Sequence, residues 1–191
     1  MSDGQQQKGA DWERFREFLN LLVRVQSDAR WRGKIDMSGV VQQTLLEAFQ
    51  AGEQLAGADD GQKAGWLKRA LANNLADEIR KLTTARRDAG RERSLQAAID
   101  ESISQLEMLA PAKQPTPSQE VVRAERLLQL TRALSSLPET QRRVIEMHHL
   151  RGETLSDVAA ALGLTRPAAA GLLHRGLKKL REILEKDLTN A

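Results

Sequence analysis

Apolar residues recur along most of the chain at intervals of three and four positions. This spacing places side chains on one face of an α-helix. Nowhere does a sustained alternation with a period of two indicate a β-strand. The pattern therefore predicts an all-α fold. The predicted helical segments are residues 12–23, 40–49, 66–82, 121–150 and 155–184.

Two stretches interrupt the helical pattern. Residues 51–65 read AGEQLAGADDGQKAG, which is typical of a loop because Gly and Asp favour turns. Residues 94–119 keep little periodicity and contain Pro111, Pro115 and Pro117. Because proline breaks a helix, we expect a flexible linker here with at most one short helix.

These breaks predict two small helical domains. The first spans 11–93 and the second 121–188, joined by a linker at 94–120. The polar segment 1–10 is expected to be disordered.

The segment LSDVAAALGLTRPAAAGLL at 155–173 predicts two helices joined by a tight turn. Thr154 is suited to cap the first helix, with Asp157 three residues on, and Gly163 suits the turn. Thr165 is suited to cap the second helix. This spacing favours a helix-turn-helix, a motif that enters the major groove of DNA. An ordinary helical hairpin is the alternative.

The second helix of this motif divides into an apolar face and a basic face. Successive residues lie 100° apart, so Ala169, Leu172 and Leu180 share the buried face. No acidic residue occurs between Arg166 and Arg181, which indicates a surface that meets phosphates rather than a merely solvated one. The candidate DNA-binding residues are Thr165, Arg166, Ala170, Gly171, His174, Arg175, Lys178 and Lys179.

Composition narrows the class of function. The 191 residues carry a net charge of +3 with a pI near 9.4, and the clustered Lys and Arg favour nucleic acid over a membrane as partner. The absence of Cys, of a signal pattern and of an apolar run near 20 residues predicts a cytoplasmic protein. The sequence contains no nucleophile elbow, phosphate-binding loop or catalytic triad. We therefore expect neither an enzyme nor a protein that binds a cofactor or a small-molecule substrate. The helical spacing of His148 and His149 is not expected to bring them together on a metal.

The C-terminal sequence resembles a known family. LSSLPETQRRVIEMHHLRGETLSDVAAALGLT, followed by HRGLKKLRE, is similar to region 4 of bacterial RNA polymerase sigma factors. VVQQTLLEAFQ and WLKRALANNLADEIRK resemble region 2. With only these two regions, the chain resembles the extracytoplasmic-function (ECF) class. The resemblance implies a protein that binds the clamp helices and flap of core RNA polymerase and recognises and opens promoter DNA. It also allows for an anti-sigma factor as partner.

The resemblance also implies where these partners are bound. Opening a duplex requires cations for the phosphates and polar or flat side chains for the unpaired bases. In the predicted helix 66–82, Asn74 lies near the apolar edge and is expected to be a buried hydrogen-bonding group. Trp66, at the start of this helix, is as well suited to the core as to stacking on a base. The residues assigned to promoter melting are Trp66, Arg69, Asn73, Asp77, Arg80, Arg86 and Arg87. Those assigned to polymerase binding are Val40, Val41, Gln42, Gln43 and Glu47.

The chain departs from the family pattern at two places. Gly39 and Gln43 stand where region 2 usually has acidic residues, and small residues at 168–171 replace the polar start of the recognition helix. We therefore expect the second domain to dock on DNA mainly by charge and shape, leaving most discrimination to the first. Two other functions remain open. They are a freestanding helix-turn-helix regulator, whose N-terminal helices would serve dimerisation or sensing, and a polymerase-binding decoy that no longer reads DNA.

Overall fold

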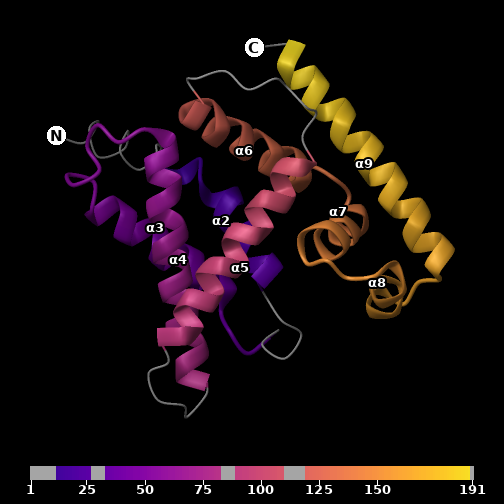
Figure 1. The fold of residues 1–191 in the computed structure, drawn as a ribbon, viewed down its shortest axis with the longest axis horizontal. Helices are drawn as coiled ribbons and strands as arrows, with labels where there is room; N and C mark the ends of the chain where they lie inside the picture. Colours follow the sequence, from indigo (N-terminus) through magenta and orange to yellow (C-terminus); the bar gives the residue numbers. More distant parts are fainter. Residues whose placement is uncertain (1–11, 27–32, 83–88, 110–118, 190–191) are drawn as a thin grey trace. The chain divides into compact units, whose positions relative to one another are not determined.

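The computed structural model describes residues 12–26, 33–82, 89–109 and 119–189 (Figure 1). These residues form eight α-helices and one π-helical turn, and no strand occurs among them, which confirms the all-α prediction. The predicted disordered residues 1–10 lie outside this part of the chain. The elements are α2 (Arg16–Gln26), α3 (Met37–Gln50), α4 (Asp60–Leu82), α5 (Ala89–Met108), α6 (Gln119–Ser135), α7 (Glu139–Ile145), η1 (Glu146–Leu150), α8 (Leu155–Leu162) and α9 (Arg166–Thr189).

Contacts divide the chain into two compact units. The first comprises residues 1–100 with 116–128, and the second comprises 101–115 with 129–191. This division runs through α5 and α6, whereas the sequence predicts domain limits near residues 93 and 121. The predicted limits stay a prediction.

The first unit is built on α2, α3 and α4, which pack against one another. Their apolar stripes form its core, where Phe15, Leu19 and Leu71 are all fully buried. The last residues of two predicted helical segments lie outside this core: Phe49 of 40–49 is 39% exposed and Leu82 of 66–82 is 46% exposed.

Side-chain caps fix where the helices of the first unit begin. Asp36 precedes α3 and accepts a hydrogen bond from the backbone N–H of Gly39 at 2.9 Å. The N–H of Gln62 donates to Asp59 Oδ1 at 2.8 Å, and the Asp59 N–H donates to Gln62 Oε1 at 3.1 Å. This reciprocal pair is a capping box, and it starts α4 at Asp60, so the last six residues of the predicted loop 51–65 are helical instead.

The prediction of at most one short helix in the linker is wrong. The twenty-residue α5 extends through Met108, and Ile99, Ile103 and Leu106 are buried on it. These three residues have the i, i+4, i+7 spacing of a helical stripe, and the three prolines all come after the helix has ended. This apolar stripe is short and flanked by polar residues, so the three prolines outweighed it and the segment was predicted to be a linker. The proline-containing part of the linker lies outside the described residues.

The second unit is organised around α9, which packs along α7 and α8 (Figure 1). Val144, Met147 and Val158 form a buried cluster, with Leu172 and Leu173 of α9 packed against it. Gly176 of α9 lies close against α7, because a Cβ atom there would lie 3.0 Å from Cδ1 of Ile145. Only glycine fits this crossing without a shift of its neighbours.

Candidate nucleic-acid interface

The helix-turn-helix begins with the predicted cap. Thr154 is extended, with φ −69° and ψ 154°, and its hydroxyl oxygen accepts a hydrogen bond from the Asp157 N–H at 3.2 Å. The same hydroxyl donates to Asp157 Oδ2 at 2.6 Å. The prediction that Thr154 caps α8 is confirmed, and the cap sets the direction in which α8 leaves the turn after η1.

The turn between the two helices is a Schellman motif. Gly163 is left-handed, with φ 66° and ψ 33°, as the sequence predicts. The Leu164 N–H donates to the carbonyl of Ala159 at 2.8 Å, and the Gly163 N–H donates to that of Ala160 at 3.3 Å. These bonds satisfy the last carbonyls of α8 and fix the path of the chain into α9.

The start of α9 also follows the sequence prediction. Thr165 Oγ1 accepts a hydrogen bond from the Ala168 N–H at 3.3 Å, which confirms it as the cap. Ala169 is fully buried, so the first turn of α9 is anchored by a single methyl group. Short side chains at this point let α9 lie close to the rest of the motif.

The basic face of α9 is exposed as predicted. Of the eight candidate residues, Ala170 and Gly171 are half-buried, and the other six are exposed. A Cβ on Gly171 would lie 3.2 Å from Nη1 of Arg175, so the guanidinium of Arg175 folds back over the glycine. Lys178 lies 4.0 Å from Glu182, one turn along the helix. Such an exposed contact contributes little and leaves the ammonium available to a phosphate.

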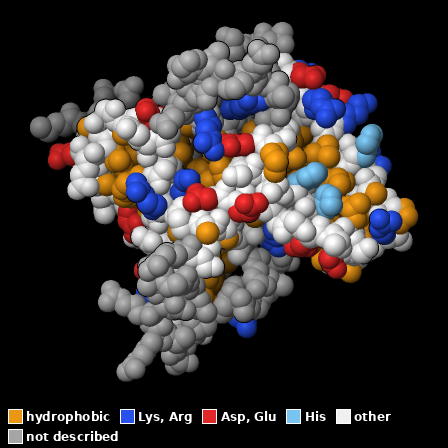
Figure 2. All heavy atoms as spheres, viewed as in Figure 1, with side chains coloured by type: hydrophobic (Ala, Val, Ile, Leu, Met, Phe, Trp, Pro, Cys, Tyr) orange, Lys and Arg blue, Asp and Glu red, His pale blue; other side chains and the backbone are white. Residues whose placement is uncertain are grey.

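The basic character belongs to α9 rather than to the molecule as a whole. On the face drawn in Figure 2, acidic and basic side chains are interspersed, and neither sign covers it. This agrees with the small net charge of +3. The unbroken run of like charge is therefore a local feature of α9.

A second polar surface runs along α4. Arg69, Asn73 and Asp77 are exposed on successive turns, and Trp66 and Arg80 are half-buried at its ends. Arg80 forms an ion pair with Asp77. These five residues follow one another at helical spacing along one face of α4, as predicted, and Asp77 pairs with Arg80 on that face. The predicted Arg86 and Arg87 lie outside the described residues.

The residues assigned to polymerase binding divide between core and surface. Val40 is 3% exposed and Val41 is 1% exposed, so both side chains support α3 from within. Gln42 and Gln43 are exposed and Glu47 is half-buried.

Sequence reasoning missed two apolar residues on the surface of α3. Leu46 is 49% exposed and Phe49 is 39% exposed. Together with Gln42 they occupy positions i, i+4 and i+7 of α3. Leu46 and Phe49 each follow a residue of the buried stripe Val41, Leu45 and Ala48 by one position, which is about 100° around the helix. This spacing could have predicted their exposure. An exposed apolar pair beside a polar amide is typical of a protein interface.

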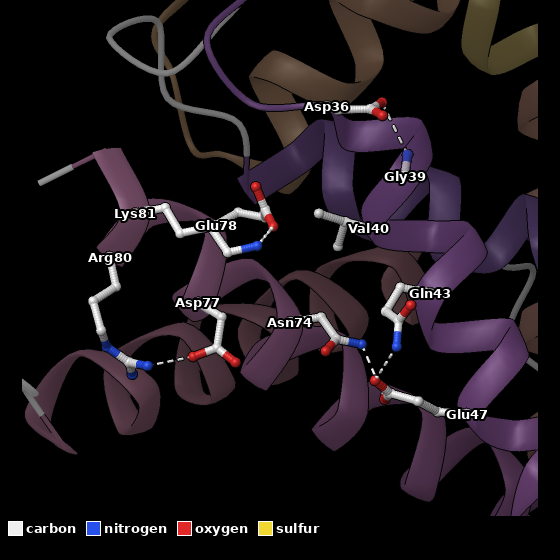
Figure 3. Close-up of a pocket in the computed structure, with 10 residues that line it drawn as sticks. All are labelled: Asp36, Gly39, Val40, Gln43, Glu47, Asn74, Asp77, Glu78, Arg80 and Lys81. Carbon is white, nitrogen blue, oxygen red and sulfur yellow. Dashed lines mark hydrogen bonds and ion pairs between the residues drawn. The ribbon is translucent and has the colours of Figure 1, made fainter.

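A groove of about 770 Å³ lies between α3 and α4 (Figure 3). Both helices contribute carboxylates and amides to it, and Lys81 pairs with Glu78 at 2.5 Å. Asn74 donates to Glu47 within the groove, which confirms its predicted hydrogen-bonding role, although the residue is half-buried rather than buried. Its lining residues are Asp36, Gly39, Val40, Gln43, Glu47, Asn74, Asp77, Glu78, Arg80 and Lys81.

The two adjacent histidines lie closer together than the sequence suggested. The ring centroids of His148 and His149 are 5.0 Å apart, and both residues belong to the π-helical turn η1. Burial, and then the proximity of His148, lower the pKa of His149 below its ordinary value. Nδ1 of His148 lies 2.8 Å from the Glu153 carbonyl oxygen. Within the described residues, no group of three or more His, Cys, Asp or Glu is arranged to hold a metal ion.

None of the described helices combines the length and apolarity that crossing a lipid bilayer requires.

Comparison with known proteins identifies the second unit first. Residues 127–180 match the family model for sigma-70, region 4. This range includes α7, η1, α8 and most of α9, and therefore the whole helix-turn-helix.

Longer similarities extend over most of the chain. The ECF RNA polymerase sigma factor SigE of Mycolicibacterium smegmatis is 27% identical over 173 residues, which are 86% of this chain and 61% of that protein. The ECF RNA polymerase sigma factor SigL of Mycobacterium tuberculosis is 28% identical over 163 residues, 82% of each chain. SigF of Caulobacter vibrioides, also an ECF sigma factor, is 41% identical over 59 residues, 31% of this chain and 33% of that protein. Most of the chain is therefore similar to ECF RNA polymerase sigma factors, and its C-terminal part carries the sequence of sigma-70 region 4.

Proposed function

We propose that this chain binds core RNA polymerase and directs it to promoter DNA at the start of transcription. Sigma factors are not enzymes, so phosphoryl transfer stays with the polymerase. In this role α9 contacts the duplex upstream, at the minus-thirty-five element, and the polar face of α4 holds unpaired bases of the minus-ten element.

One observation carries this proposal. A helix-turn-helix with an unbroken basic face occurs in the same chain as a separate unit whose α4 presents Arg69 and Asn73 to solvent. A freestanding regulator needs only the first of these surfaces to bind an operator. Cations and amides in one row suit the holding of an opened strand.

Two surfaces of this chain are proposed to bind core polymerase. The exposed side of α3, with Gln42, Leu46 and Phe49, is suited to the clamp helices, since apolar residues ringed by polar ones favour a protein partner. Gln43 and Glu47 lie at the edge of this surface. The flap is assigned to the region 4 unit. Because core RNA polymerase and promoter DNA are cytoplasmic, we propose that this protein acts in the cytoplasm. An anti-sigma factor that covers the same surfaces would compete with core polymerase there.

Run-off transcription with purified core polymerase tests the proposed function. Addition of this protein to core enzyme and a promoter library should produce transcripts with defined start sites, and its affinity for core should exceed its affinity for duplex DNA alone. Tight, sequence-specific operator binding without polymerase, with no stimulation of initiation, would instead identify a freestanding regulator. Core binding without any transcript would identify a polymerase-binding decoy.

The basic face of α9 should bind DNA without strong base readout. Bidentate base contacts need Arg, Lys, Asn or Gln at the start of the recognition helix. Here that start carries Ala168, Ala170 and Gly171, whereas Arg175 and Lys178 lie one and two turns further on. Cations at these positions are suited to phosphates, and phosphate contacts fix the position of a helix without reading sequence.

Replacing Arg175 or Lys178 by Ala should therefore weaken holoenzyme binding to all upstream sequences by a similar factor. Each substitution should also reduce the slope of log affinity against log salt by about 1, as expected for one lost phosphate contact. The measurement is a salt titration on duplexes that differ only in the upstream element. Arg132→Ala, which removes an exposed arginine of α6 in the same unit, should change neither quantity. A loss confined to one upstream sequence would show base readout instead.

A further inference from the structure

A polar network joins the two helices that the proposed function uses for different partners. The Asn74 side-chain amide on α4 donates to Thr44 Oγ1 at 3.1 Å and to Glu47 Oε2 at 3.1 Å, both on α3. Gln43 Nε2 donates to the other oxygen of Glu47 at 2.8 Å. Figure 3 shows the amides of Asn74 and Gln43 converging on this carboxylate from the two sides of the groove.

Each group at the centre of this network is matched to its neighbour. An Asn amide has two N–H donors, and one goes to Thr44 and the other to Glu47. The Thr44 hydroxyl is fully buried and donates to the Val40 carbonyl at 2.8 Å, which leaves its oxygen to accept from Asn74. Glu47 receives a bond at each oxygen. The network therefore has one preferred geometry, with the two helices in one register.

Apolar packing alone would not fix that register. Apart from Thr44, the buried side chains of α3 and α4 are Val, Leu, Ile and Ala, whose contacts do not depend on direction. Hydrogen bonds require defined distances and angles, so a shift of α4 along α3 breaks all of those that Asn74 makes. Asn74 directly follows Asn73 and precedes Asp77 by less than one turn. Its position therefore sets where the promoter-facing side of α4 lies.

We propose that Asn74 is a positioning residue for promoter opening, a role that rests on the sigma function proposed above. It acts through Glu47 and Thr44, by holding α4 in register with the polymerase-bound α3. Asn74 itself touches neither DNA nor polymerase in this role. When core polymerase fixes α3, the network transmits that position to Arg69 and Asn73, which meet the unpaired bases.

Exchanging the donor and acceptor tests this role. Asn74→Asp removes both donors and places a second carboxylate against Glu47, so the two helices should be forced apart. At saturating core polymerase, open-complex formation on a duplex promoter should fall by about tenfold or more, the scale expected when reacting groups are displaced by an ångström. Core affinity is measured for every variant by titration. Adding Glu47→Gln should restore most of the rate, because the new amide can donate across the same distance to the carboxylate introduced at position 74.

Three control variants separate register from charge and from stability. Glu78→Gln removes another carboxylate of the groove, one that pairs with Lys81, and should not restore the Asn74→Asp variant. Asn74→Ala loses the bonds without adding charge, so it should show a smaller defect in opening, and it replaces the Asn74→Asp variant if that protein does not fold. Val25→Ala removes buried methyl groups from α2 and lowers stability outside the network, so opening should stay close to that of the native protein once the protein is folded.

The outcomes distinguish this role from the function on which it rests. Failure of the unmodified protein to bind core polymerase overturns the proposed function. Normal core binding and normal opening by folded Asn74→Asp and Asn74→Ala overturn the positioning role alone. Equal rescue by Glu78→Gln and Glu47→Gln would show that only the charge of the groove matters, which also overturns it. A selective loss of opening with rescue only by Glu47→Gln supports it.

Discussion

Replacing Arg69, Asn73 and Arg80 together by Ala should lower the rate of promoter opening by roughly a hundredfold, while core affinity changes by less than about twofold. Contacts to unpaired bases and their backbone contribute about 1–3 kcal/mol each, and about 1.4 kcal/mol corresponds to a tenfold change. Arg69 and Asn73 are exposed, so their loss leaves the core of the unit intact. The ion pair of Arg80 with Asp77 lies near the surface and adds little stability.

A template melted in advance should recover much of this loss, since the strands are already separated. Opening is measured by the fluorescence of a base analogue in the minus-ten element, and core affinity by titration. Lys81→Ala is the matched control, because Lys81 is a cation of the same helix that pairs with Glu78 beside the groove. Normal opening by the triple variant would show that the polar face of α4 is not the strand-binding surface.

Local signals predicted the helix-turn-helix almost completely. The cap at Thr154, the left-handed Gly163 and the cap at Thr165 depend on bonds between residues five or fewer positions apart. Such interactions are determined by backbone geometry within one or two turns, so a sequence without its fold is sufficient. The buried Ala169 followed from helical spacing in the same way.

Features that depend on the neighbour of a helix were harder to predict. Val40 and Val41 were assigned to polymerase because they belong to the region 2 motif, yet both are buried. Leu46 and Phe49 are exposed although they are apolar. A stripe of apolar residues shows that a helix has a buried side, but a wide stripe leaves its edges undetermined. Which edge is covered depends on how α3 crosses α4.

The network around Asn74 shows the same limit at the level of a single side chain. Its place near the apolar edge predicted a hydrogen-bonding role, and the structure confirms one. The partners, Thr44 and Glu47, lie 30 and 27 positions away in the chain. No periodicity connects residues across such a distance, so only the tertiary packing of α3 on α4 could identify them. The length of α5 was missed for a related reason, since its buried stripe is short.

Gly171 and Gly176 of α9 should respond in opposite ways to the same substitution. At Gly176 the new Cβ would meet Ile145 Cδ1 at 3.0 Å and Gln141 Cβ at 3.3 Å. Ile145 is fully buried and the Gln141 Cβ is attached to the backbone, so neither atom can move aside easily. Gly176→Val should therefore lower the free energy of unfolding by about 1–3 kcal/mol, the usual cost of overpacking. At Gly171 the new Cβ meets only Nη1 of Arg175, at 3.2 Å, and that flexible side chain can move aside.

Gly171→Val should therefore keep the stability within about 0.5 kcal/mol, because valine and glycine differ little in helix propensity. It should nevertheless weaken holoenzyme binding to the upstream duplex by about tenfold, because a branched side chain on the DNA-facing surface prevents close approach of the backbone, at a cost of about 1.4 kcal/mol. Urea unfolding of the full chain and duplex binding by the holoenzyme measure the two effects separately. Undiminished DNA binding by a stable Gly171→Val variant would mean that the start of α9 does not approach the duplex, and the small residues there would need another explanation.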